Sequence, residues 1–216
     1  LGDDISKVGD LFRPIRSKGF EREILENPDH RKYSGYFDEV NGFKGWFYFT
    51  PENQIEHIQL RYWAYPEIDG LPTKNRPIYY LDTLGNPDEA FIYYQFDNSI
   101  VWWSQLFLFY PDISVVITIH QFFLGDYEAL TLDVCPNYYN ISSEGTGFVE
   151  VFVGSSDAYE TKVNDLIEYI QEDMQFGTNY KFTSEGQYTT QEIIDAILAP
   201  AGDPAECLTL SLEPRE

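Results

Sequence analysis

Basic residues are scarce in this chain of 216 residues, which has 14 lysines and arginines against 36 aspartates and glutamates. The formal net charge is −22. Successive thirds carry −4, −7 and −11, from 9 basic against 13 acidic residues, 2 against 9, and 3 against 14. A protein that binds nucleic acid needs basic side chains to displace counterions from phosphates, and docking on an anionic membrane has the same requirement. We therefore expect no direct nucleic-acid binding, whereas the charge suits a basic protein partner.

Motifs for metals are also missing. The chain has two cysteines, Cys135 and Cys207, and three histidines, and none of them falls in a CxxC or HExxH pattern. No acidic loop has the DxDxDG spacing of a calcium site. We therefore expect no metal and no cofactor. The cysteines allow either one long-range disulfide or two thiols, and the sequon at Asn140 together with the start at Leu1 leaves cytoplasmic and secreted locations both open.

Catalytic motifs are absent from the sequence as well. There is no GxSxG turn for a nucleophilic serine and no GxxxxGK[ST] loop for a phosphate. Thirty-six acidic residues make some carboxylate pair inevitable, so a pair alone carries no information about glycoside hydrolysis. No residue is assigned a catalytic role, and the sequence leans toward a protein that is not an enzyme.

The longest apolar stretch, NSIVWWSQLFLFYPDISVVITIHQFFLG at 98–125, is not a membrane span. A spanning helix needs about 20 mainly apolar residues, and here Pro111-Asp112 interrupts the middle. Proline, β-branched residues and this turn signal favour two strands joined as a hairpin. The first strand is apolar on both faces, with Trp102, Leu106 and Leu108 on one and Trp103, Phe107 and Phe109 on the other. Such a strand belongs at the centre of a covered sheet.

Aromatic residues are abundant, at 17% of the chain, and they favour strands. Runs about ten residues apart predict strands at KYSGYFDEV, GWFYFT, IEHIQLRYW, IYYLDTL, AFIYYQF, IVWWSQLFLFY, ISVVITIHQFF, EALTLDV and GFVEVFV. Asn41-Gly42 predicts a hairpin turn between the first two. The spacing indicates a large antiparallel sheet over 33–153, in a sandwich or barrel-like arrangement.

Helical periodicity follows the predicted strands. Apolar residues at helical spacing predict one helix over 157–176, with a capping-box-like start at Asp157, and a second over 190–199 capped by Thr189 and Glu192. In the second helix Ile193, Ile194, Ile197 and Leu198 are expected to face inward. Strands followed by helices predict an α+β fold whose helices (within 154–200) cover one face or mouth of the sheet. We interpret the chain as a single domain (1–216), with an irregular or helical lead-in (1–30) and an acidic tail (201–216) in which CLTLSL adds an edge strand.

A candidate ligand pocket is drawn from polar and aromatic residues of the predicted strands. In IEHIQLRYW the residues His57, Gln59, Arg61 and Trp63 share one face, and we add Trp102, Trp103 and His120 from the central hairpin. These residues line a pocket only if their strand faces meet, which the sequence does not decide. The alternative is that the polar ones lie on a solvated sheet face and the tryptophans pack in the core.

Three functions are compatible with these features. The first is a non-enzymatic acidic protein that neutralises a basic partner, as an inhibitor, an immunity protein or a mimic of nucleic acid, since carboxylates can stand in for phosphates. The surface expected to contact the basic partner is the first long helix, over 157–176. The second is a β-cup that binds an apolar or aromatic small molecule, and the third is a secreted sandwich that binds or cleaves carbohydrate. The residues of the expected acidic surface are Glu160, Asp165, Glu168, Glu172 and Asp173.

Overall fold

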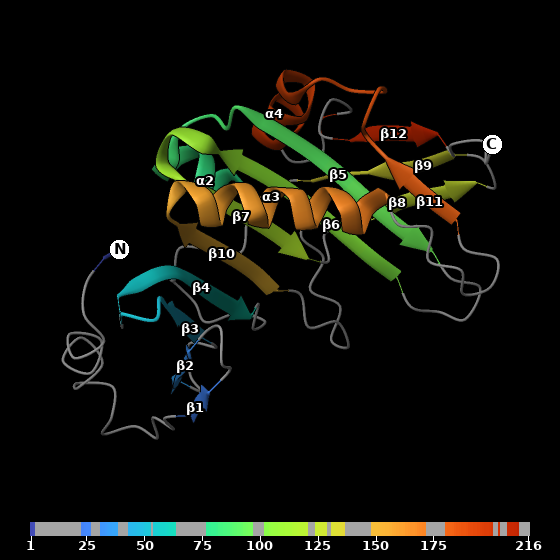
Figure 1. The fold of residues 1–216 in the computed structure, drawn as a ribbon. Coiled ribbons are helices and arrows are strands. Elements are labelled where there is room, and N and C mark those ends of the chain that lie inside the picture. Colours follow the sequence, from blue (N-terminus) through green and yellow to red (C-terminus); the bar gives the residue numbers. More distant parts are fainter. Residues whose placement is uncertain are drawn as a thin grey trace.

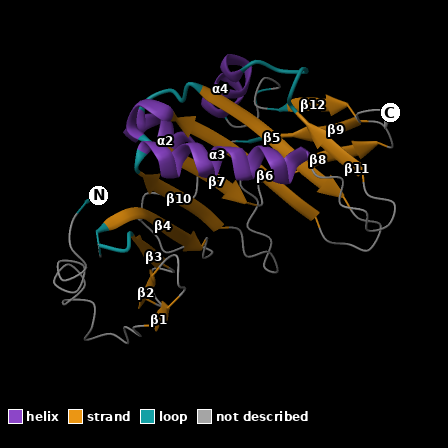
Figure 2. Cartoon of the chain, viewed as in Figure 1, coloured by secondary structure: helices purple, strands orange, loops and turns teal. Residues whose placement is uncertain are grey.

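The computed structural model describes residues 1–2, 23–26, 31–38, 43–52, 54–63, 77–96, 102–120, 124–128, 131–136, 148–171, 180–200, 203 and 207–211. Within them an α+β fold contains a nine-stranded antiparallel sheet and a separate three-stranded sheet, with helices on both faces of the large sheet (Figure 1, Figure 2). From edge to edge the large sheet consists of β1 (Glu23–Glu26), β2 (Arg31–Asp38), β3 (Phe43–Phe49), β4 (Ile55–Trp63), β10 (Phe148–Gly154), β7 (Val115–His120), β6 (Trp102–Tyr110), β5 (Glu89–Phe96) and β11 (Tyr180–Thr183).

The strands on either side of two predicted turns pair as antiparallel neighbours. β2 and β3 pair as antiparallel neighbours, with Gly35 opposite Gly45, and the expected Asn41-Gly42 turn lies outside the described residues. β6 and β7 are joined by a 3-10 turn, η2 (Pro111–Ile113), and Ser114 follows it with a φ of 51°. The long apolar stretch is therefore a hairpin inside the sheet, as predicted.

The alternating side chains of β6 are buried on both faces of the sheet. Leu106 and Leu108 are 0% exposed in an apolar cluster on one face, and Phe107 and Phe109 belong to a mostly aromatic cluster on the other. This two-sided burial confirms that β6 is an inner strand under cover on both sides. We call the two sides the α4 face and the α3 face, after the helix that covers each.

The α3 face is covered by α3 (Ser156–Gln171), which runs across the inner strands (Figure 1). Val163, Leu166 and Ile170 pack on the cluster that contains Phe107 and Phe109. The helix starts immediately after β10, and its first turn is capped by Ser155, whose hydroxyl accepts a hydrogen bond from the amide of Ala158 at 3.3 Å. The cap is therefore Ser155 rather than the expected Asp157, because the helix already begins at Ser156.

The α4 face is covered by two helices and the small sheet. The helices are α2 (Pro77–Leu84) and α4 (Thr190–Leu198), and the sheet consists of β12 (Leu208–Ser211), β9 (Thr131–Val134) and β8 (Leu124–Glu128). All three layers contribute to one apolar cluster, whose members include Leu81, Ile193, Leu132 and Leu210. A disulfide between Cys135 and Cys207 joins the end of β9 to the start of β12, so the predicted edge strand in the tail is tied to its partner.

Several expectations are corrected by the structure. The segment IYYLDTL is part of helix α2 rather than a strand, and residues 23–26 of the expected helical lead-in form strand β1. The two C-terminal helices do not share one face, because β11 pairs with β5 at the sheet edge between them and the chain crosses to the other side there. Leu198 is 48% exposed, since α4 ends at this residue. The helix expected over 157–176 is described to Gln171.

Candidate functional site

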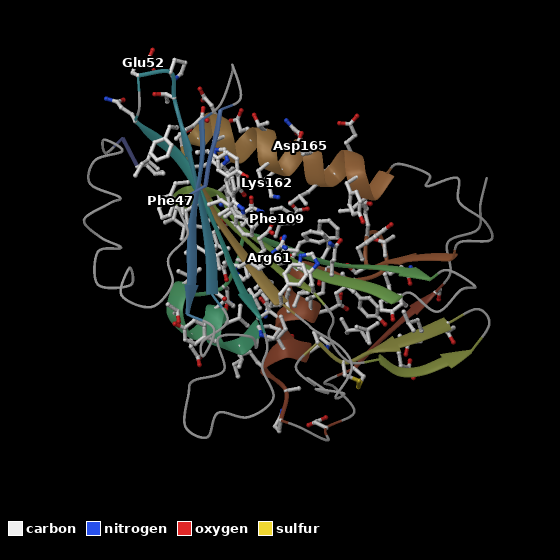
Figure 3. All side chains as sticks on the ribbon, turned by 90° about the horizontal axis from the view of Figure 1, so that it is seen from below. Phe47, Glu52, Arg61, Phe109, Lys162 and Asp165 are labelled. Atoms are coloured by element: carbon white, nitrogen blue, oxygen red, sulfur yellow. A yellow bond between two sulfur atoms is a disulfide. The ribbon has the colours of Figure 1, made fainter. Side chains whose placement is uncertain are left out.

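A buried carboxylate lies between the sheet and α3. Glu150 in β10 is 8% exposed, and its Oε2 accepts a hydrogen bond from Nη2 of Arg61 at 3.0 Å. Arg61 is its direct cross-strand neighbour in β4. From the helix above, Nζ of Lys162 lies 3.6 Å from Oε1 of the same carboxylate. We call Arg61, Glu150 and Lys162 the Glu150 network, and Figure 3 shows Lys162 on the sheet-facing side of α3.

The two cations keep Glu150 ionised. Burial by itself would raise the pKa of Glu150, but the Lys162 ammonium and the hydrogen bonds from Arg61 and Gln59 outweigh it and hold this pKa below its ordinary value. The pKa of His120 in the adjacent strand β7 is lowered as well, which favours the neutral ring. Burial, with further contributions from Arg61 and Lys162, lowers the pKa of His120 to about 4, although Glu150 opposes the shift.

Aromatic rings enclose this charged group. The ring of Phe148 stacks on His120 at 3.9 Å between ring centres, and the Arg61 guanidinium carbon lies 4.4 Å from the Phe148 ring centre on β10. Trp46 is 5.2 Å from the same guanidinium. Because a guanidinium is attracted to aromatic faces, Phe148 and Trp46 position Arg61 toward Glu150. The Glu150 network is thus flanked by aromatic rings on the face of the sheet that α3 covers.

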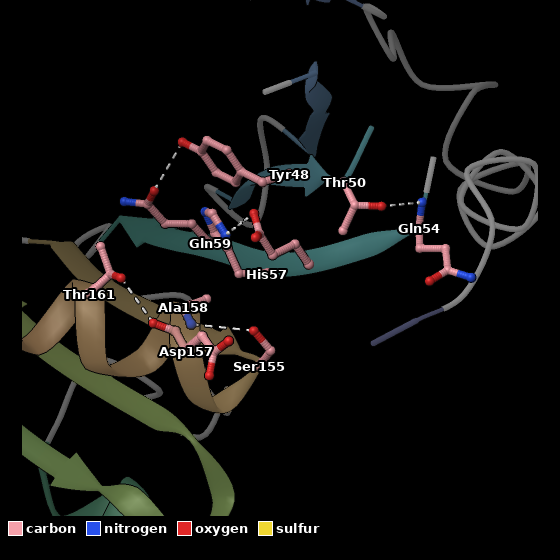
Figure 4. A network of polar contacts seen from close by, with 10 residues as sticks. Tyr48, Thr50, Gln54, His57, Gln59, Ser155, Asp157, Ala158 and Thr161 are labelled. Carbon is pink, nitrogen blue, oxygen red and sulfur yellow. Dashed lines mark hydrogen bonds and ion pairs between the residues drawn. The ribbon is translucent and has the colours of Figure 1, made fainter. Parts of the chain in front are cut away.

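The polar surface continues outward along β3 and β4. Tyr48 stacks on His57 with 4.0 Å between ring centres, and its hydroxyl donates a hydrogen bond to Gln59 Oε1 at 3.4 Å (Figure 4). His57 also lies 3.6 Å from the Glu56 carboxylate and 5.2 Å from the Phe152 ring centre. These contacts bind β3, β4 and β10 to one another through their side chains.

The structure brings four of the seven expected pocket residues onto one face. Gln59, Arg61 and His120 lie around Glu150 on the α3 face, whereas His57 lies on the same face at the other end of β10, opposite Gly154. The backbone of Trp63 pairs with Phe148 and that of Trp103 with Gln95, but the side chains of Trp63, Trp102 and Trp103 lie outside the described set. These four residues therefore share one face of the sheet, next to Phe148 and Trp46, and the pocket that they were expected to line stays a prediction.

Sequence reasoning missed Glu150 and Lys162. The available signal was the single charge in the apolar strand FVEVFVG, because a charge that enters a core must find a partner there. The partner strand could not be identified, because β10 inserts between β4 and β7 and that order is not a property of any local pattern.

The Glu150 network is suited to holding α3 in place rather than to proton transfer. A general acid or base works best with a pKa near the operating pH, and the pKa values of both Glu150 and His120 are shifted below their ordinary values. Among the described residues no group of three or more His, Cys, Asp or Glu side chains has the geometry to hold a metal ion. The network links three elements, β4, β10 and α3, through one carboxylate.

A cavity of about 320 Å³ lies away from this network, between α3, the start of β5 and the turn that leads into α4. Its apolar lining includes Phe91, Ile167 and Ile170, and its polar lining includes Glu89 and Glu185. The described cavity is therefore in a different place from the expected pocket.

The expected acidic surface on α3 is partly described. Glu160, Asp165 and Glu168 are exposed, and Figure 3 shows Asp165 on the side of α3 away from the sheet. Asp157 adds a fourth exposed carboxylate in the first turn. Glu172 and Asp173 lie outside the described residues.

Comparisons with other proteins give no relative from which a role could be transferred. No family model, no curated protein and no solved structure matches the chain. In the described part of the chain, no helix has the length and apolar character needed to cross a membrane. Any statement of function therefore rests on the residues themselves.

Proposed function

We propose that this protein is a non-enzymatic binding protein that binds a basic protein partner on its acidic surface. The observation that carries the proposal is the uneven use of charge. Arg61 and Lys162 are the basic residues whose side chains the structure describes, and both contact the buried Glu150. The exposed carboxylates within the same described part belong to Glu52, Asp82, Asp88, Glu89, Asp112, Asp157, Glu160, Asp165, Glu168, Glu185, Glu192, Asp195 and Asp203.

Helix α3 is the favoured contact surface. Asp157, Glu160, Asp165 and Glu168 are exposed at steps of three to five residues, which places them along the outer side of the helix. From Asp157 to Glu168 this row is about 16 Å long at 1.5 Å per residue. A row of carboxylates fixed on a helix can replace a row of phosphates in the site of a basic, nuclease-type protein, which is how an inhibitor or immunity protein of this kind would act.

The Glu150 network supports this role because it fixes the helix that carries the row. Lys162 extends from the sheet-facing side of α3 to Glu150, while Val163 and Leu166 pack on the sheet. A surface that is already ordered before binding loses less conformational entropy on association. The Glu150 network thus holds in place the helix that carries the exposed carboxylates.

The two alternatives have less support in the structure. Apolar clusters fill both faces of the inner sheet, and the described cavity carries Glu89 and Glu185 in its lining, which does not suit a purely apolar ligand. A carbohydrate platform needs an accessible aromatic face. Trp46, the tryptophan whose side chain is described, lies against Arg61.

The test uses a variant in which the row on α3 is neutralised by isosteric amides: Asp157→Asn, Glu160→Gln, Asp165→Asn and Glu168→Gln. Association rates are measured against a panel of basic proteins, including DNA- and RNA-cleaving domains, and against acidic proteins of similar size. We expect binding to at least one basic nuclease, with an association rate that falls about tenfold as salt is raised and about tenfold in the variant, because long-range attraction sets this rate.

The control variant removes the same number of charges elsewhere, through Glu52→Gln, Asp82→Asn, Asp112→Asn and Asp195→Asn. Its association rate should stay within about twofold of the unchanged protein, since a screened charge acts mainly on its neighbourhood. Absence of binding across the panel contradicts the proposal. Equal losses of association rate in both variants would show that net charge acts without a defined surface. That result would also contradict the proposal.

A further inference from the structure

The cavity beside α3 is lined by elements that come from three separate parts of the chain. The start of β5 contributes Glu89 and Phe91, α3 contributes Ile167 and Ile170, and the turn before α4 contributes residues 184–186 and 188–190. Its volume of about 320 Å³ is near the lower end of the range of roughly 300–1,000 Å³ typical of small-molecule sites. It therefore suits one side chain or a compact ligand.

The walls of this cavity are held by hydrogen bonds before any ligand arrives. The hydroxyl of Ser184 accepts from the amide of Ile92 at 2.8 Å, and the hydroxyl of Thr190 accepts from the amide of Ala90 at 3.1 Å. The turn itself passes through Gly186, whose φ of 71° lies in the left-handed region that favours glycine. The cavity is thus a preformed feature of the fold rather than a gap between loose segments.

The charge of the lining is negative. Glu89 and Glu185 are both exposed, and no lysine, arginine or histidine contributes to the described lining. Asp88 adds a third carboxylate close by. Burial raises the pKa of Tyr159 in α3, and the negative charges of Glu89 and Asp88 raise it further, so both carboxylates lie near α3. A cation that enters this cavity gains attraction from two or three carboxylates.

An anion is disfavoured even though the first turn of α4 contributes to the lining. The amino end of a helix ordinarily attracts anions, but here the chain supplies its own. The Glu192 carboxylate accepts hydrogen bonds from the amide and hydroxyl of Thr189, and the Thr189 hydroxyl accepts from the Glu192 amide. This capping box satisfies the helix end internally.

The apolar part of the lining selects for a cation with a hydrocarbon stem. Ile170 is 3% exposed at the inner wall, whereas Ile167 is 40% exposed, which is unusual for an isoleucine on a helix that packs on a core. Phe91 adds an aromatic surface. Lysine and arginine side chains combine such a stem with a charged end.

We propose that this cavity receives one lysine or arginine side chain of the basic partner. The inference rests on the proposed function, because it identifies where on the acidic surface the partner inserts a side chain. The stem lies against Ile167, Ile170 and Phe91, and the charged end lies between Glu89 and Glu185. The neighbouring row on α3 attracts the partner over distance, and the cavity fixes its position.

The first test uses n-butylguanidinium as the probe, with 1-butanol and butyrate as neutral and anionic probes of similar length. Binding is followed on the full chain by NMR, through the methyl signals of Ile167 and Ile170 and the amide signal of Gly186. We expect saturable shifts with butylguanidinium. Because two carboxylates act on the charge, the double variant Glu89→Gln, Glu185→Gln should bind it about tenfold more weakly. The affinity of the control variant Glu52→Gln, Asp82→Asn for butylguanidinium should stay within about twofold of that of the unchanged protein.

Equal binding of butanol, stronger binding of butyrate, or an unchanged affinity in the Glu89→Gln, Glu185→Gln variant overturns the inference. The second test keeps it separate from the proposed function, using the basic nuclease bound in the association experiment. If the nuclease binds the unchanged protein and the cavity variant equally well, the cavity inference is wrong while the proposed function stands. If butylguanidinium binds but no basic protein does, the proposed function is wrong, and so is the partner assigned to the cavity.

Discussion

The two faces of the large sheet are built from the same strands but with different chemistry. On the α4 face, β5, β6, β7 and β10 contribute Ile92, Leu106, Leu108, Ile117 and Val149 to one large apolar cluster. On the α3 face the same four strands contribute a smaller aromatic cluster together with buried polar groups, namely Gln105, Thr118, His120 and Glu150. Alternation along each strand separates the two sets.

The contrast shows how one sheet serves two purposes. Apolar contacts stabilise a fold without directional preference, so the α4 face can join two helices and a second sheet by burial alone. A buried charge needs partners at defined positions. We therefore infer that the Glu150 network sets the position of α3, the helix whose outer side carries the acidic row.

The first prediction concerns the apolar face. Leu108→Ala removes a side chain that is 0% exposed in the middle of the α4-face cluster. We expect the free energy of unfolding to fall by about 3 kcal/mol, since the loss of buried methyl groups leaves a cavity. Chemical denaturation measures this change, with no selective effect on the α3 signals in NMR.

Ile113→Ala is the matched control, because Ile113 is 50% exposed in the turn η2. Its effect should stay within about 0.5 kcal/mol. If both variants lose the same stability, burial on the α4 face is not what stabilises the fold.

The second prediction concerns the charged face. Glu150→Gln removes the carboxylate but leaves Arg61 and Lys162 in place, and we expect a loss of about 2 kcal/mol. This value is below that of a fully buried pair, because the Arg61 and Lys162 side chains remain 31% and 23% exposed. Unlike Leu108→Ala, the variant should raise hydrogen exchange selectively in α3.

The control for this prediction is the double variant Glu150→Gln, Lys162→Met, which removes the unpaired ammonium along with the carboxylate. It should recover part of the lost stability, because an apolar chain replaces a charge left without its partner. Uniform exchange changes in α3 and α4 would contradict a specific role of the Glu150 network in positioning α3.

The strands and the two-sided character of β6 were predictable because their signals are local. Phe107 and Leu108 are both apolar and adjacent, so a strand that contains them must be covered on two sides. The capping box of Thr189 and Glu192 is likewise a pattern within four residues, and the structure contains it.

Failures arose where two patterns competed or where distant segments meet. IYYLDTL reads as an aromatic strand, yet Pro77 occupies the first helical position and Gly85 follows the last with a φ of 85°, which together indicate a helix. Burial of Tyr80 and Leu81 against α4 then decides the outcome. The candidate site was predictable only in part, because Arg61 and His120 come together at Glu150 through β10, which lies between their strands.

The third prediction tests the charged face through pH. His120 faces Glu150 from β10, Arg61 from β4 and Lys162 from α3, and Gln105 Nε2 lies 3.3 Å from its Nδ1. The folded protein holds the pKa of His120 at about 4, whereas an unfolded histidine titrates near about 6.5. The unfolded state therefore binds more protons between these values. The stabilisation is complete above about pH 6.5 and is lost as the pH falls toward about 4.

Lowering the pH from 7 to 5.5 should therefore cost the unchanged protein about 1 kcal/mol more than it costs the His120→Gln variant, whose amide does not titrate. Denaturation at both pH values measures this difference, and parallel pH dependences would contradict it. A neutral His120 ring at pH 5.5, seen by NMR, would place the effect on this residue. The apolar α4 face provides the internal comparison. Leu108→Ala should lower the stability by the same amount at both pH values, because the substitution removes no titratable group.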